Sequence, residues 1–316
     1  MPKILSGVLL APYTTFKVGG EAKYFLEAKT KEDVIFGLKF AREKSVPLFI
    51  LGGGSNILVS DNGFSGLVIK CNLSNIRCQG KKIYAEAGVF LSSILSQSVK
   101  RGLTGMEWAV GIPGTIGGAI FGNAGAFGED IGSVTEKIRV IDIEDLSEKE
   151  FQNQKCNFGY RTSIFKENKI KKQKEYIIIG GELKLAIGDK KNIKEKVKNN
   201  FDWKKEHQPL NFFSAGSIFK NLEVKNYNTK FWSEFPELKK FQNTQIIPAA
   251  YLIDKCGLKG KRIGGVMISD LHSNFILNIQ NAKAKDIDRL IKYIKIKVRE
   301  KYNILLEEEI QYVGVF

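Results

Sequence analysis

The sequence predicts an α+β protein with more than one domain. Short apolar segments typical of strands recur along the chain, separated by amphipathic helices and by glycine-dense loops. The chain has 316 residues, of which 43 % are hydrophobic, so it is long enough to bury two or three cores. The composition changes at Gly188 and Asp189, where we expect a domain boundary.

The chain carries a net charge of +15. Such a charge can attract anionic ligands or nucleic acid, or it can reflect a lysine-rich solvated surface. We favour the solvated surface over nucleic acid, because no helix-turn-helix, zinc finger or aromatic RNA-binding motif accompanies the charge. Anionic nucleotides as ligands would also be attracted by this field.

The sequence has no pattern typical of membrane insertion, export or metal binding. No apolar stretch approaches the roughly 20 residues of a membrane helix. The first ten residues also lack a basic region followed by an apolar core. The four cysteines and two histidines show no ligand spacing. We therefore expect free thiols and no metal site in a cytoplasmic protein.

A strand–helix–strand unit begins the chain. Residues 23–28 form the first strand, and Thr30 with Asp33 forms a capping box for the helix that follows. Pro47 ends any continuation of that helix, and residues 48–51 are apolar enough for a buried strand.

This strand runs into a first glycine loop, whose residues 52–56 are GGGSN, and a short strand at 57–59 follows. A Rossmann loop or a P-loop would open into a helix, and neither a helix signal nor G-K-[ST] occurs here. A nest of backbone N–H groups for a pyrophosphate is consistent with the loop. An ordinary tight turn is the alternative.

The second glycine loop, residues 111–128, is GIPGTIGGAIFGNAGAFG, in which seven of eighteen residues are glycine. Without side chains the backbone can approach a partner closely, which suits a flat or phosphorylated ligand held by N–H groups. The alternative is a surface loop or a tightly packed helix contact.

The other elements follow from hydrophobic periodicity. A basic amphipathic helix begins near Asn192, with Ile193, Val197 and Phe201 on its inner face. Gly102 ends an earlier helix. We expect a hairpin tip at 167–175, helices at 91–99, 251–256 and 287–298, and strands at 66–70, 81–87, 137–143, 176–185, 263–268, 274–279 and 304–313.

Five motifs occur in order: GGGSN, the second glycine loop, GYRTSIFK from Gly159, SAGSIFKN from Ser214, and a last strand with three glutamates. With them the sequence resembles the UDP-N-acetylenolpyruvoylglucosamine reductases, or UDP-N-acetylmuramate dehydrogenases, which are flavoproteins of peptidoglycan precursor synthesis. The similarity covers nearly the whole chain, from about Thr14 to Gly314.

The resemblance implies an α+β fold of the vanillyl-alcohol-oxidase (PCMH) type. Two FAD-binding subdomains, residues 1–59 and 60–188, would share one noncovalent FAD, and residues 189–316 would form an α+β substrate domain. The two glycine loops would hold the FAD from its two sides. The matching positions are Gly52, Gly53, Gly54, Ser55, Asn56, Ile112, Pro113, Gly114, Thr115, Gly117, Gly118, Gly122, Asn123, Ala124 and Gly125.

The reaction of that family is reduction of UDP-N-acetylglucosamine enolpyruvate to UDP-N-acetylmuramate, with NADPH as hydride donor and FAD as carrier. Ser217, in AGSIFKN, matches the family's proton donor. A serine hydroxyl is a weak acid, but it can protonate a strongly basic carbon. Arg161 matches the catalytic arginine, which can clamp the substrate carboxylate as charge develops. Glu309 matches the catalytic glutamate, and Glu307, on the same strand face, is the alternative.

Further positions match substrate contacts of the family, namely Tyr160, Lys205, Lys220, Asn221 and His272. For His272 a surface position is the alternative. Gln311 stands where many members have arginine, which weakens one expected contact to a carboxylate or phosphate.

Two other functions are compatible with parts of the sequence. An FAD-dependent sugar or lactone oxidase of the same fold would take electrons from an alcohol and would not need Ser217 as an acid. A nucleic-acid-binding module would bind with steep salt dependence and be colourless. SAGSIFKN and the terminal glutamate favour the reductase, which we expect to be a monomer that binds neither nucleic acid nor membranes.

Overall fold

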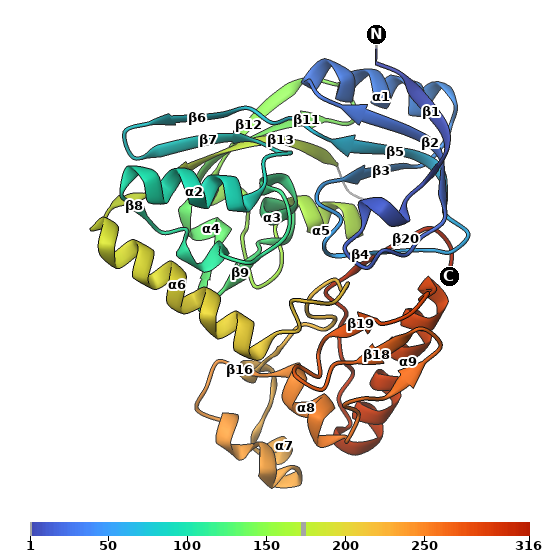
Figure 1. The fold of residues 1–316 in the computed structure, drawn as a ribbon, viewed down its shortest axis with the longest axis vertical. Helices are drawn as coiled ribbons and strands as arrows, with labels where there is room; N and C mark the ends of the chain where they lie inside the picture. The colour runs from blue at the N-terminus through green and yellow to red at the C-terminus, as the bar shows by residue number, and fades with distance from the viewer. Residues whose placement is uncertain (1, 172–174) are drawn as a thin grey trace. The chain divides into compact units, whose positions relative to one another are not determined.

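The computed structural model describes residues 2–171 and 175–316, which form two compact units (Figure 1). Unit 1 comprises the chain up to Val8, Glu21–Gly54 and Phe64–Glu206. Unit 2 comprises Leu9–Gly20, Ser55–Gly63 and His207–Phe316. Two short segments from the N-terminal part of the sequence therefore pack with its C-terminal part.

The first sheet of unit 1 has the strand order β1-β2-β5-β3. β2 and β3 both run parallel to β5, and α1 packs against β2 and β5. The Thr30–Asp33 capping box that the sequence predicts is present and confirmed at the start of α1. The bounds are β1 (Ile4–Leu9), β2 (Glu21–Ala28), α1 (Lys31–Glu43), β3 (Leu48–Leu51) and β5 (Phe64–Cys71).

The second sheet of unit 1 is antiparallel, with the order β12-β11-β13-β7-β6. Gly102, in a left-handed conformation, caps α2 as the sequence predicts. The bounds are β6 (Ile76–Gln79), β7 (Lys82–Glu86), α2 (Leu91–Arg101), α3 (Ile116–Gly122), β11 (Thr135–Asp142), β12 (Glu148–Gln152), α5 (Ile164–Ile170), β13 (Tyr176–Lys184) and α6 (Lys190–His207).

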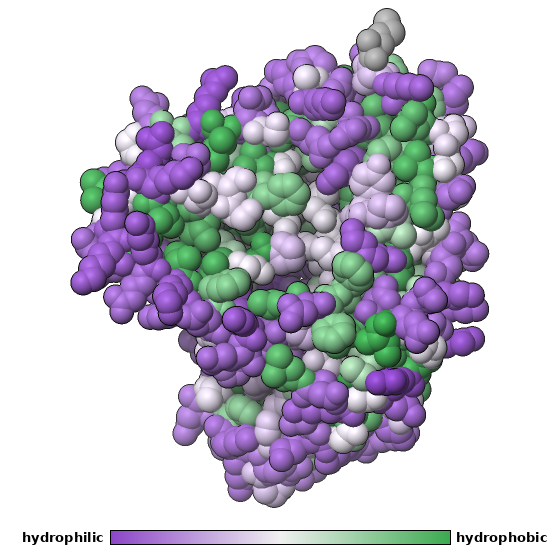
Figure 2. All heavy atoms as spheres, in the orientation of Figure 1, coloured by the Kyte–Doolittle hydropathy of each residue, from purple (hydrophilic) through white to green (hydrophobic). Residues whose placement is uncertain are grey.

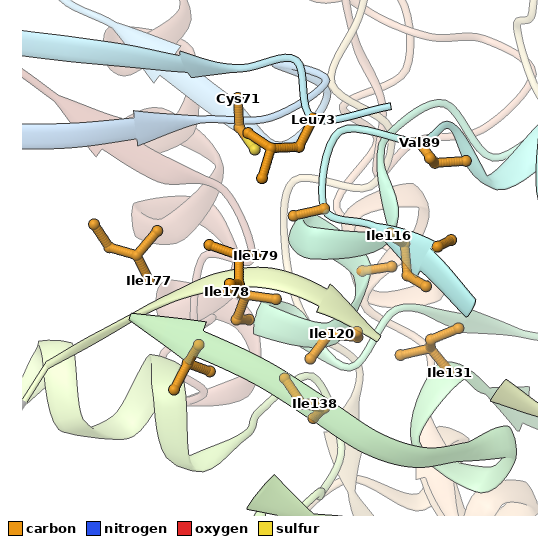
Figure 3. Close-up of a cluster of buried hydrophobic side chains, with 14 of the residues drawn as sticks. Cys71, Leu73, Val89, Ile116, Ile120, Ile131, Ile138, Ile177, Ile178 and Ile179 are labelled. Atoms are coloured by element: carbon orange, nitrogen blue, oxygen red, sulfur yellow. The ribbon is translucent and has the colours of Figure 1, made fainter. Parts of the chain in front are cut away.

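One buried apolar cluster joins the two sheets of unit 1 and places α3 against β13 (Figure 3). Ile116 and Ile120 of α3 face the isoleucines of β11 and β13 in this cluster. Gly181 of β13 leaves room for α3, because a Cβ atom there would lie 2.7 Å from Ile120 Cδ1. The second glycine loop, which contains α3, is thus fixed to the sheet by close packing.

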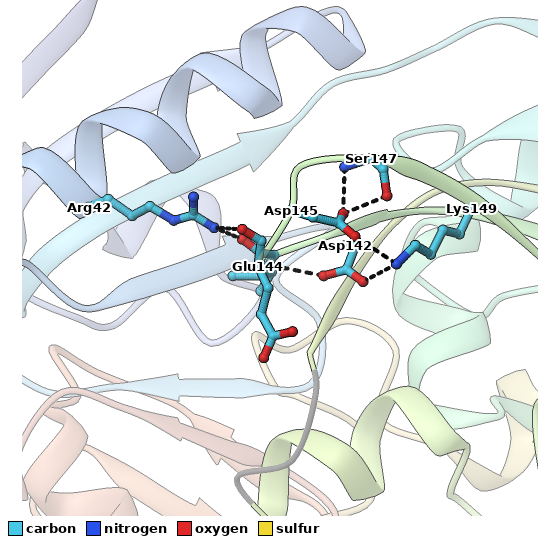
Figure 4. A network of polar contacts seen from close by, with 7 residues as sticks. Arg42, Asp142, Glu144, Asp145, Ser147 and Lys149 are labelled. Atoms are coloured by element: carbon cyan, nitrogen blue, oxygen red, sulfur yellow. Dashed lines mark hydrogen bonds and ion pairs between the residues drawn. The ribbon is translucent and has the colours of Figure 1, made fainter.

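A polar network fixes the turn between β11 and β12 (Figure 4). The Asp142 side chain is buried, accepts a bond from Lys149 Nζ at 2.5 Å and accepts a second from the Glu144 N–H at 2.9 Å. Arg42 of α1 donates to the carbonyls of Ile143 and Glu144. A buried carboxylate such as that of Asp142 needs hydrogen-bond partners. The bonds from Arg42 also connect α1, which packs on the first sheet, to the turn between two strands of the second sheet.

Unit 2 surrounds its own apolar core, to which α8 and α9 contribute continuous faces. A short sheet has the order β17-β18-β19, and β4 pairs in parallel with β20. The bounds are β4 (Ile57–Val59), α7 (Thr229–Glu234), α8 (Ala249–Lys255), β17 (Arg262–Ile263), β18 (Val266–Ile268), β19 (Ile276–Asn278), α9 (Ala284–Tyr302) and β20 (Gln311–Val313).

The remaining elements are short. They are η1 (Ala11–Tyr13), β8 (Leu103–Thr104), η2 (Glu107–Ala109), β9 (Gly125–Ala126), β10 (Glu129–Asp130), α4 (Ile131–Val134), η3 (Asn153–Lys155), β14 (Ala186–Ile187), β15 (Leu222–Glu223), η4 (Val224–Asn226), η5 (Pro236–Phe241) and β16 (Ile246–Ile247).

Three expected elements are corrected by the structure. Residues 263–268 form a hairpin rather than one strand, because Gly264, at φ +54°, and Gly265 reverse the chain between β17 and β18. Of the expected strand 304–313 only β20, which pairs with β4, is a regular strand among the described residues, and Glu308 forms an isolated bridge with Phe219. α5 occupies Ile164–Ile170, so the expected hairpin tip at 167–175 begins within a helix, and its residues 172–174 lie outside the described residues.

The two compact units of the structure have other boundaries than the three expected domains. α6 packs with unit 1, because Ile193 is buried there and Asn200 Nδ2 donates to the Glu107 carbonyl at 3.2 Å. Phe201 is exposed and not on the inner face of α6 as expected. The division into two FAD-binding subdomains and a substrate domain stays a prediction about ligand binding.

The surface view in Figure 2 is largely hydrophilic. The lysines of α6 contribute to this character, since Lys190, Lys191, Lys194, Lys196 and Lys198 are all exposed. Among the described residues, no helix combines the length and the apolar character that crossing a membrane requires.

The segment Ser55–Gly63 is fixed to unit 2 by a helix cap supplied from a distance. The Asp61 carboxylate accepts the Ala284 N–H at 2.8 Å and the Lys285 N–H at 3.0 Å, which are the first two N–H groups of α9. A carboxylate at a helix N-terminus satisfies free donors and interacts favourably with the helix dipole.

We predict that Asp61→Ala lowers the free energy of unfolding of unit 2 by about 1 kcal/mol. Urea unfolding followed by tryptophan fluorescence would measure the loss. Glu300→Gln, which removes an exposed ion pair with Lys297 on the same helix, is the matched control and should change stability by less than about 0.5 kcal/mol. Equal losses in the two variants would contradict the capping role.

Candidate functional site

In unit 1 the two glycine loops meet backbone to backbone. A Cβ atom on Gly53 would lie 2.7 Å from Gly114 Cα, and one on Gly52 would lie 2.8 Å from Thr115 Oγ1. Gly54 and Gly114 have φ angles of +65° and +134°, which side-chain-bearing residues rarely adopt. Glycine is therefore required here by close approach and by conformation.

Two polar groups lie beside this contact. Lys70, at the end of β5, donates from Nζ to the Gly52 carbonyl, and burial lowers the pKa of this lysine. Thr115 is 1 % exposed, and its Oγ1 has no hydrogen-bond partner among the described residues. An unpartnered buried hydroxyl beside a side-chain-free cradle fits a ligand that carries acceptor oxygens, such as the pyrophosphate of FAD.

The other glycines of the second loop differ in their surroundings. Gly117 and Gly125 are packed against protein backbone, since a Cβ atom would lie 3.0 Å from the Ala87 carbonyl oxygen and 2.4 Å from that of Glu129. Gly118 and Gly122 face open space or nearly so. Gly118 and Gly122 therefore have a face that a ligand can approach, as does Gly128. The Ile112 N–H donates to the Ala109 carbonyl just before the loop, and the Ala124 N–H donates to the Ala119 carbonyl within it.

The side chain of Asn123 is used within the protein. It is 2 % exposed, donates to the Gly159 carbonyl at 2.8 Å and to Asp130, and accepts the Gly132 N–H at 2.9 Å. The amide of Asn123 connects the second glycine loop to the loop that begins at Gly159, and contact of Asn123 with the cofactor stays a prediction.

Arg161 lies on that connected loop. Its Nη2 donates to the Gly125 carbonyl at 2.8 Å, and its backbone has a φ of +55°, which is uncommon for a residue with a side chain. Lys166 Nζ donates to the Arg161 carbonyl at 3.0 Å and supports this conformation. Tyr160 is half-exposed, with the guanidinium 5.4 Å from its ring. Arg161 and Tyr160 therefore lie at the second glycine loop of unit 1.

Lys204 also reaches the second glycine loop, although the sequence pointed to Lys205. Lys204 is 3 % exposed, donates to the Val110 carbonyl at 2.7 Å and lies 5.5 Å from the Phe127 ring. Burial lowers the pKa of Lys204 to about 8. Lys205, in contrast, is exposed.

In unit 2 the segment that contains Ser217 lies beside the segment that contains Glu309. The Glu309 N–H donates to the Ile218 carbonyl at 2.7 Å, and Phe219 pairs with Glu308 in an antiparallel bridge. Gly216, at φ +74°, turns the chain directly before Ser217. Asn56 Nδ2 donates to the Glu309 carbonyl at 3.2 Å, so the end of the first glycine loop reaches the same place within unit 2.

The alternative glutamate, Glu307, has a different environment. Its side chain is 70 % exposed and forms an ion pair with Lys220. Glu308 pairs with Lys295 at 2.8 Å. Residues 307–309 pair with residues 218–220 in one isolated antiparallel bridge rather than in a regular strand, and the choice of Glu309 over Glu307 stays a prediction.

Two further expected substrate contacts lie in unit 2. Asn221 Oδ1 accepts the Ala249 N–H at 3.1 Å, at the start of α8. His272 is half-buried, packs 4.7 Å from the Phe275 ring, and burial lowers its pKa, so its neutral form is favoured. Ser217, Glu309, Lys220, Asn221 and His272 therefore belong to one unit, whereas Arg161 and Tyr160 belong to the other.

Sequence reasoning missed Lys70 and Lys204, which bond to the glycine loops, and Asn274, whose Nδ2 donates to the Phe219 carbonyl at 2.9 Å beside Ser217. Lysines are abundant, so neither lysine stands out by type. Asn274 lies in SDLHSNFILN, where His272 alone drew attention. Among the described residues there is no cluster of three or more histidine, cysteine or acidic side chains that could hold a metal.

Two family models match the chain in the order expected. An FAD binding domain matches residues 22–145, and the C-terminal domain of UDP-N-acetylenolpyruvoylglucosamine reductase matches residues 208–313. Together with the mixed helices and sheets, they confirm the expected α+β fold, an FAD-binding part followed by a C-terminal domain.

Curated relatives extend the similarity over nearly the whole chain. A UDP-N-acetylenolpyruvoylglucosamine reductase of Caldanaerobacter subterraneus subsp. tengcongensis is 38 % identical over 307 residues, which cover 96 % of this chain and 91 % of the relative. The protein of the same name from Clostridium tetani is 37 % identical over 97 % of this chain and 91 % of its own length. The crystal structure of the reductase from Thermus caldophilus superposes with a TM-score of 0.76, at 29 % identity and 99 % coverage of both chains.

We predict that Gly53→Ala weakens FAD binding by at least about tenfold, because the added methyl separates the two glycine loops. Fluorescence titration of the FAD-free protein with FAD would measure the dissociation constant. Gly122→Ala adds the same methyl in open space, so any weakening in that variant reports contact with the cofactor rather than a clash within the protein. Unchanged affinity in Gly53→Ala would show that the loops can separate without loss.

The pKa of Lys204, at about 8, predicts a pH dependence of stability. Burying the charged form is unfavourable, and this cost is fully present below pH 8, where Lys204 is protonated in both states. As the pH rises above 8 the folded form deprotonates while the unfolded form stays charged up to its ordinary pKa, so the cost is progressively removed. The wild type should therefore gain stability relative to Lys204→Met by up to about 1 kcal/mol per pH unit. Urea unfolding at pH 7, 8 and 9 tests this, and a difference that is constant with pH would contradict it.

Proposed function

We propose roles for individual residues of this chain, which belongs to the UDP-N-acetylenolpyruvoylglucosamine reductases. The chain is an FAD-dependent oxidoreductase that reduces the enolpyruvyl ether of UDP-N-acetylglucosamine in peptidoglycan precursor synthesis. The roles proposed here concern how its own side chains bind, orient and protonate.

The two glycine loops are proposed to hold FAD without a covalent bond. Gly52, Gly53, Gly54, Gly114 and Thr115 would hold its pyrophosphate, since they form the side-chain-free cradle of unit 1. Gly118 and Gly122 would offer the open face of α3. When bound, FAD supplies the transfer of hydride from a nicotinamide to the enolpyruvyl group.

Ser217 is the proposed proton donor. When hydride adds to the terminal carbon of the enolpyruvyl double bond, the electron pair moves to the carbon beside the carboxylate. That carbon is then basic enough to take the proton from Ser217 Oγ, although a serine hydroxyl is a weak acid. The observation that carries this proposal is the pairing of the Ser217 segment with Glu309 within unit 2.

Glu309 and Arg161 are proposed to assist this step. The bond from the Glu309 N–H to the Ile218 carbonyl keeps the glutamate beside the segment of Ser217, where its carboxyl group can take part in proton transfer. The guanidinium of Arg161 would bind the substrate carboxylate bidentately and stabilise the enolate-like charge. The bond from Asn123 to the Gly159 carbonyl orients the loop of Arg161 for this role.

Tyr160, Lys205, Lys220, Asn221 and His272 are proposed to contact the UDP-sugar. Lys220 forms an ion pair with Glu307, which is exposed, so a phosphate can replace that carboxylate at little cost. We further propose NADPH as the donor, and a cytoplasmic monomer, because one chain carries every residue assigned here.

We predict that Ser217→Ala leaves flavin reduction by NADPH within about twofold of wild type and slows reoxidation by UDP-N-acetylglucosamine enolpyruvate by roughly 100-fold or more. The reason is that only the second half-reaction requires a proton at carbon. Anaerobic stopped-flow absorbance of the flavin measures each half-reaction separately.

Ser214→Ala, a change three residues earlier in the same motif, is the matched control and should leave both half-reactions near wild type. Reoxidation of Ser217→Ala at the wild-type rate would refute the proton-donor role. A yellow protein that responds neither to NADPH nor to the enolpyruvyl compound would instead favour the oxidase alternative.

A further inference from the structure

The segment that presents Ser217 has little regular structure of its own. Residues 214–221 contain no helix or strand, and Gly216 has a left-handed backbone conformation. Glycine has no Cβ, so its backbone can adopt many conformations and does not by itself fix the direction of the chain. The direction of the Ser217 side chain must therefore be fixed by bonds to other parts of unit 2.

Asn274 makes three such bonds. Its Nδ2 donates to the Phe219 carbonyl at 2.9 Å, and its Oδ1 accepts the Phe219 N–H at 3.0 Å. Its own backbone carbonyl accepts the Ile218 N–H at 2.9 Å. The amide thus binds both polar backbone groups of Phe219, in the way that a neighbouring strand would.

Asn274 is 3 % exposed, so water cannot replace these bonds. The next residue, Phe275, pairs directly with Ser217 in an antiparallel bridge. On its other side the Ser217 segment bonds to the backbone of residues 307–309, as described above. The Asn274 side chain therefore bonds directly to the backbone of the segment that carries Ser217.

We propose that Asn274 is a positioning residue for the reaction, and that its carboxamide fixes the backbone of Ile218 and Phe219 so that the Ser217 hydroxyl keeps a productive direction. This inference rests on the proposed role of Ser217 as proton donor. It assigns to Asn274 no contact with substrate or cofactor.

The chemistry of the site requires an amide. The residue must donate to a carbonyl and accept from an N–H at the same time, which an amide of this length can do. Aspartate accepts from the Phe219 N–H but places a second acceptor against the Phe219 carbonyl. Leucine has the same branched arrangement of heavy atoms, although it is larger, and it removes both bonds, so the two variants separate loss of the donor from loss of the whole contact.

The test uses the FAD-containing enzyme with Asn274→Asp and Asn274→Leu. Each variant is first reduced anaerobically with NADPH and then mixed with UDP-N-acetylglucosamine enolpyruvate, while the flavin absorbance is followed. We expect flavin reduction within about twofold of wild type and reoxidation slowed by at least about tenfold, because small misplacements of a reacting group are costly. Retention of FAD and the wild-type reduction rate show that a variant is folded.

Ser273→Ala is the matched control. Ser273 is buried in the same loop and donates from Oγ to the Ala250 carbonyl at 2.6 Å, away from the Ser217 segment. Its loss should leave reoxidation within about twofold of wild type, since no bond to residues 217–219 is removed.

A double variant distinguishes positioning from a general structural effect. If Asn274 acts through the hydroxyl of Ser217, adding Asn274→Asp to Ser217→Ala slows reoxidation no further, whereas a general structural defect slows it by the same factor in both backgrounds. That second result overturns the proposal, and so does wild-type reoxidation in both Asn274 variants when Ser217→Ala is slow. Wild-type reoxidation in Ser217→Ala itself would show that the proposed proton donor is wrong, and the positioning role with it.

Discussion

The contact between the two glycine loops is the constraint on which the arrangement of unit 1 depends. Gly53 and Gly114 approach so closely that a single methyl group does not fit between them. Such contact needs both loops in fixed places, and the surrounding packing provides this. α3 lies against Gly181 of β13, and Asn123 connects the second loop to the residues around Arg161. Glycine supplies the space, but the packing of α3 on β13 and the bonds of the buried Asn123 side chain fix the position of the second loop.

In unit 2, hydrogen bonds from polar side chains hold irregular segments in place where regular secondary structure is absent. Much of it consists of short strands and irregular segments, so backbone groups that a sheet would satisfy need other partners. Asn274 supplies them for Phe219, and Asp61 supplies them for the start of α9. Asn278 Nδ2 likewise donates to the Phe16 carbonyl at 2.8 Å. Each of these bonds joins segments that are distant in sequence, which explains why short pieces of the N-terminal half belong to this unit.

The sequence predicted elements where local signals were complete. The Thr30–Asp33 box and the Gly102 cap are local, and α1 and α2 were confirmed as predicted. Of the expected strand 304–313 only β20 is regular, because residues 307–309 pair with residues 218–220 through one isolated bridge and its flanking backbone bonds rather than through a continuous ladder. The expected boundary at Gly188 lies before α6, whereas α6 packs with unit 1, because amphipathicity shows that a helix packs but not which element it packs against. The roles of the site residues came from motif resemblance, whereas Lys204 and Asn274 were missed because their partners are backbone groups that no side-chain pattern reveals.

Two lysines, the half-buried Lys70 and the buried Lys204, connect the charge of the chain with its proposed cofactor site. Lys70 donates to the Gly52 carbonyl and Lys204 to the Val110 carbonyl, which precede Gly53 and Gly111. In a trans peptide the C=O and the following N–H point in opposite directions. When a lysine binds the carbonyl of one residue, the N–H of the following glycine therefore points away from the lysine. This glycine N–H is then directed to the other side of the loop. Burial weakens the charged form of both lysines, and a nearby pyrophosphate would favour it. Lys70 and Lys204 therefore both orient the glycine loops and attract an anionic cofactor. The lysines on the exposed face of α6 remain in water.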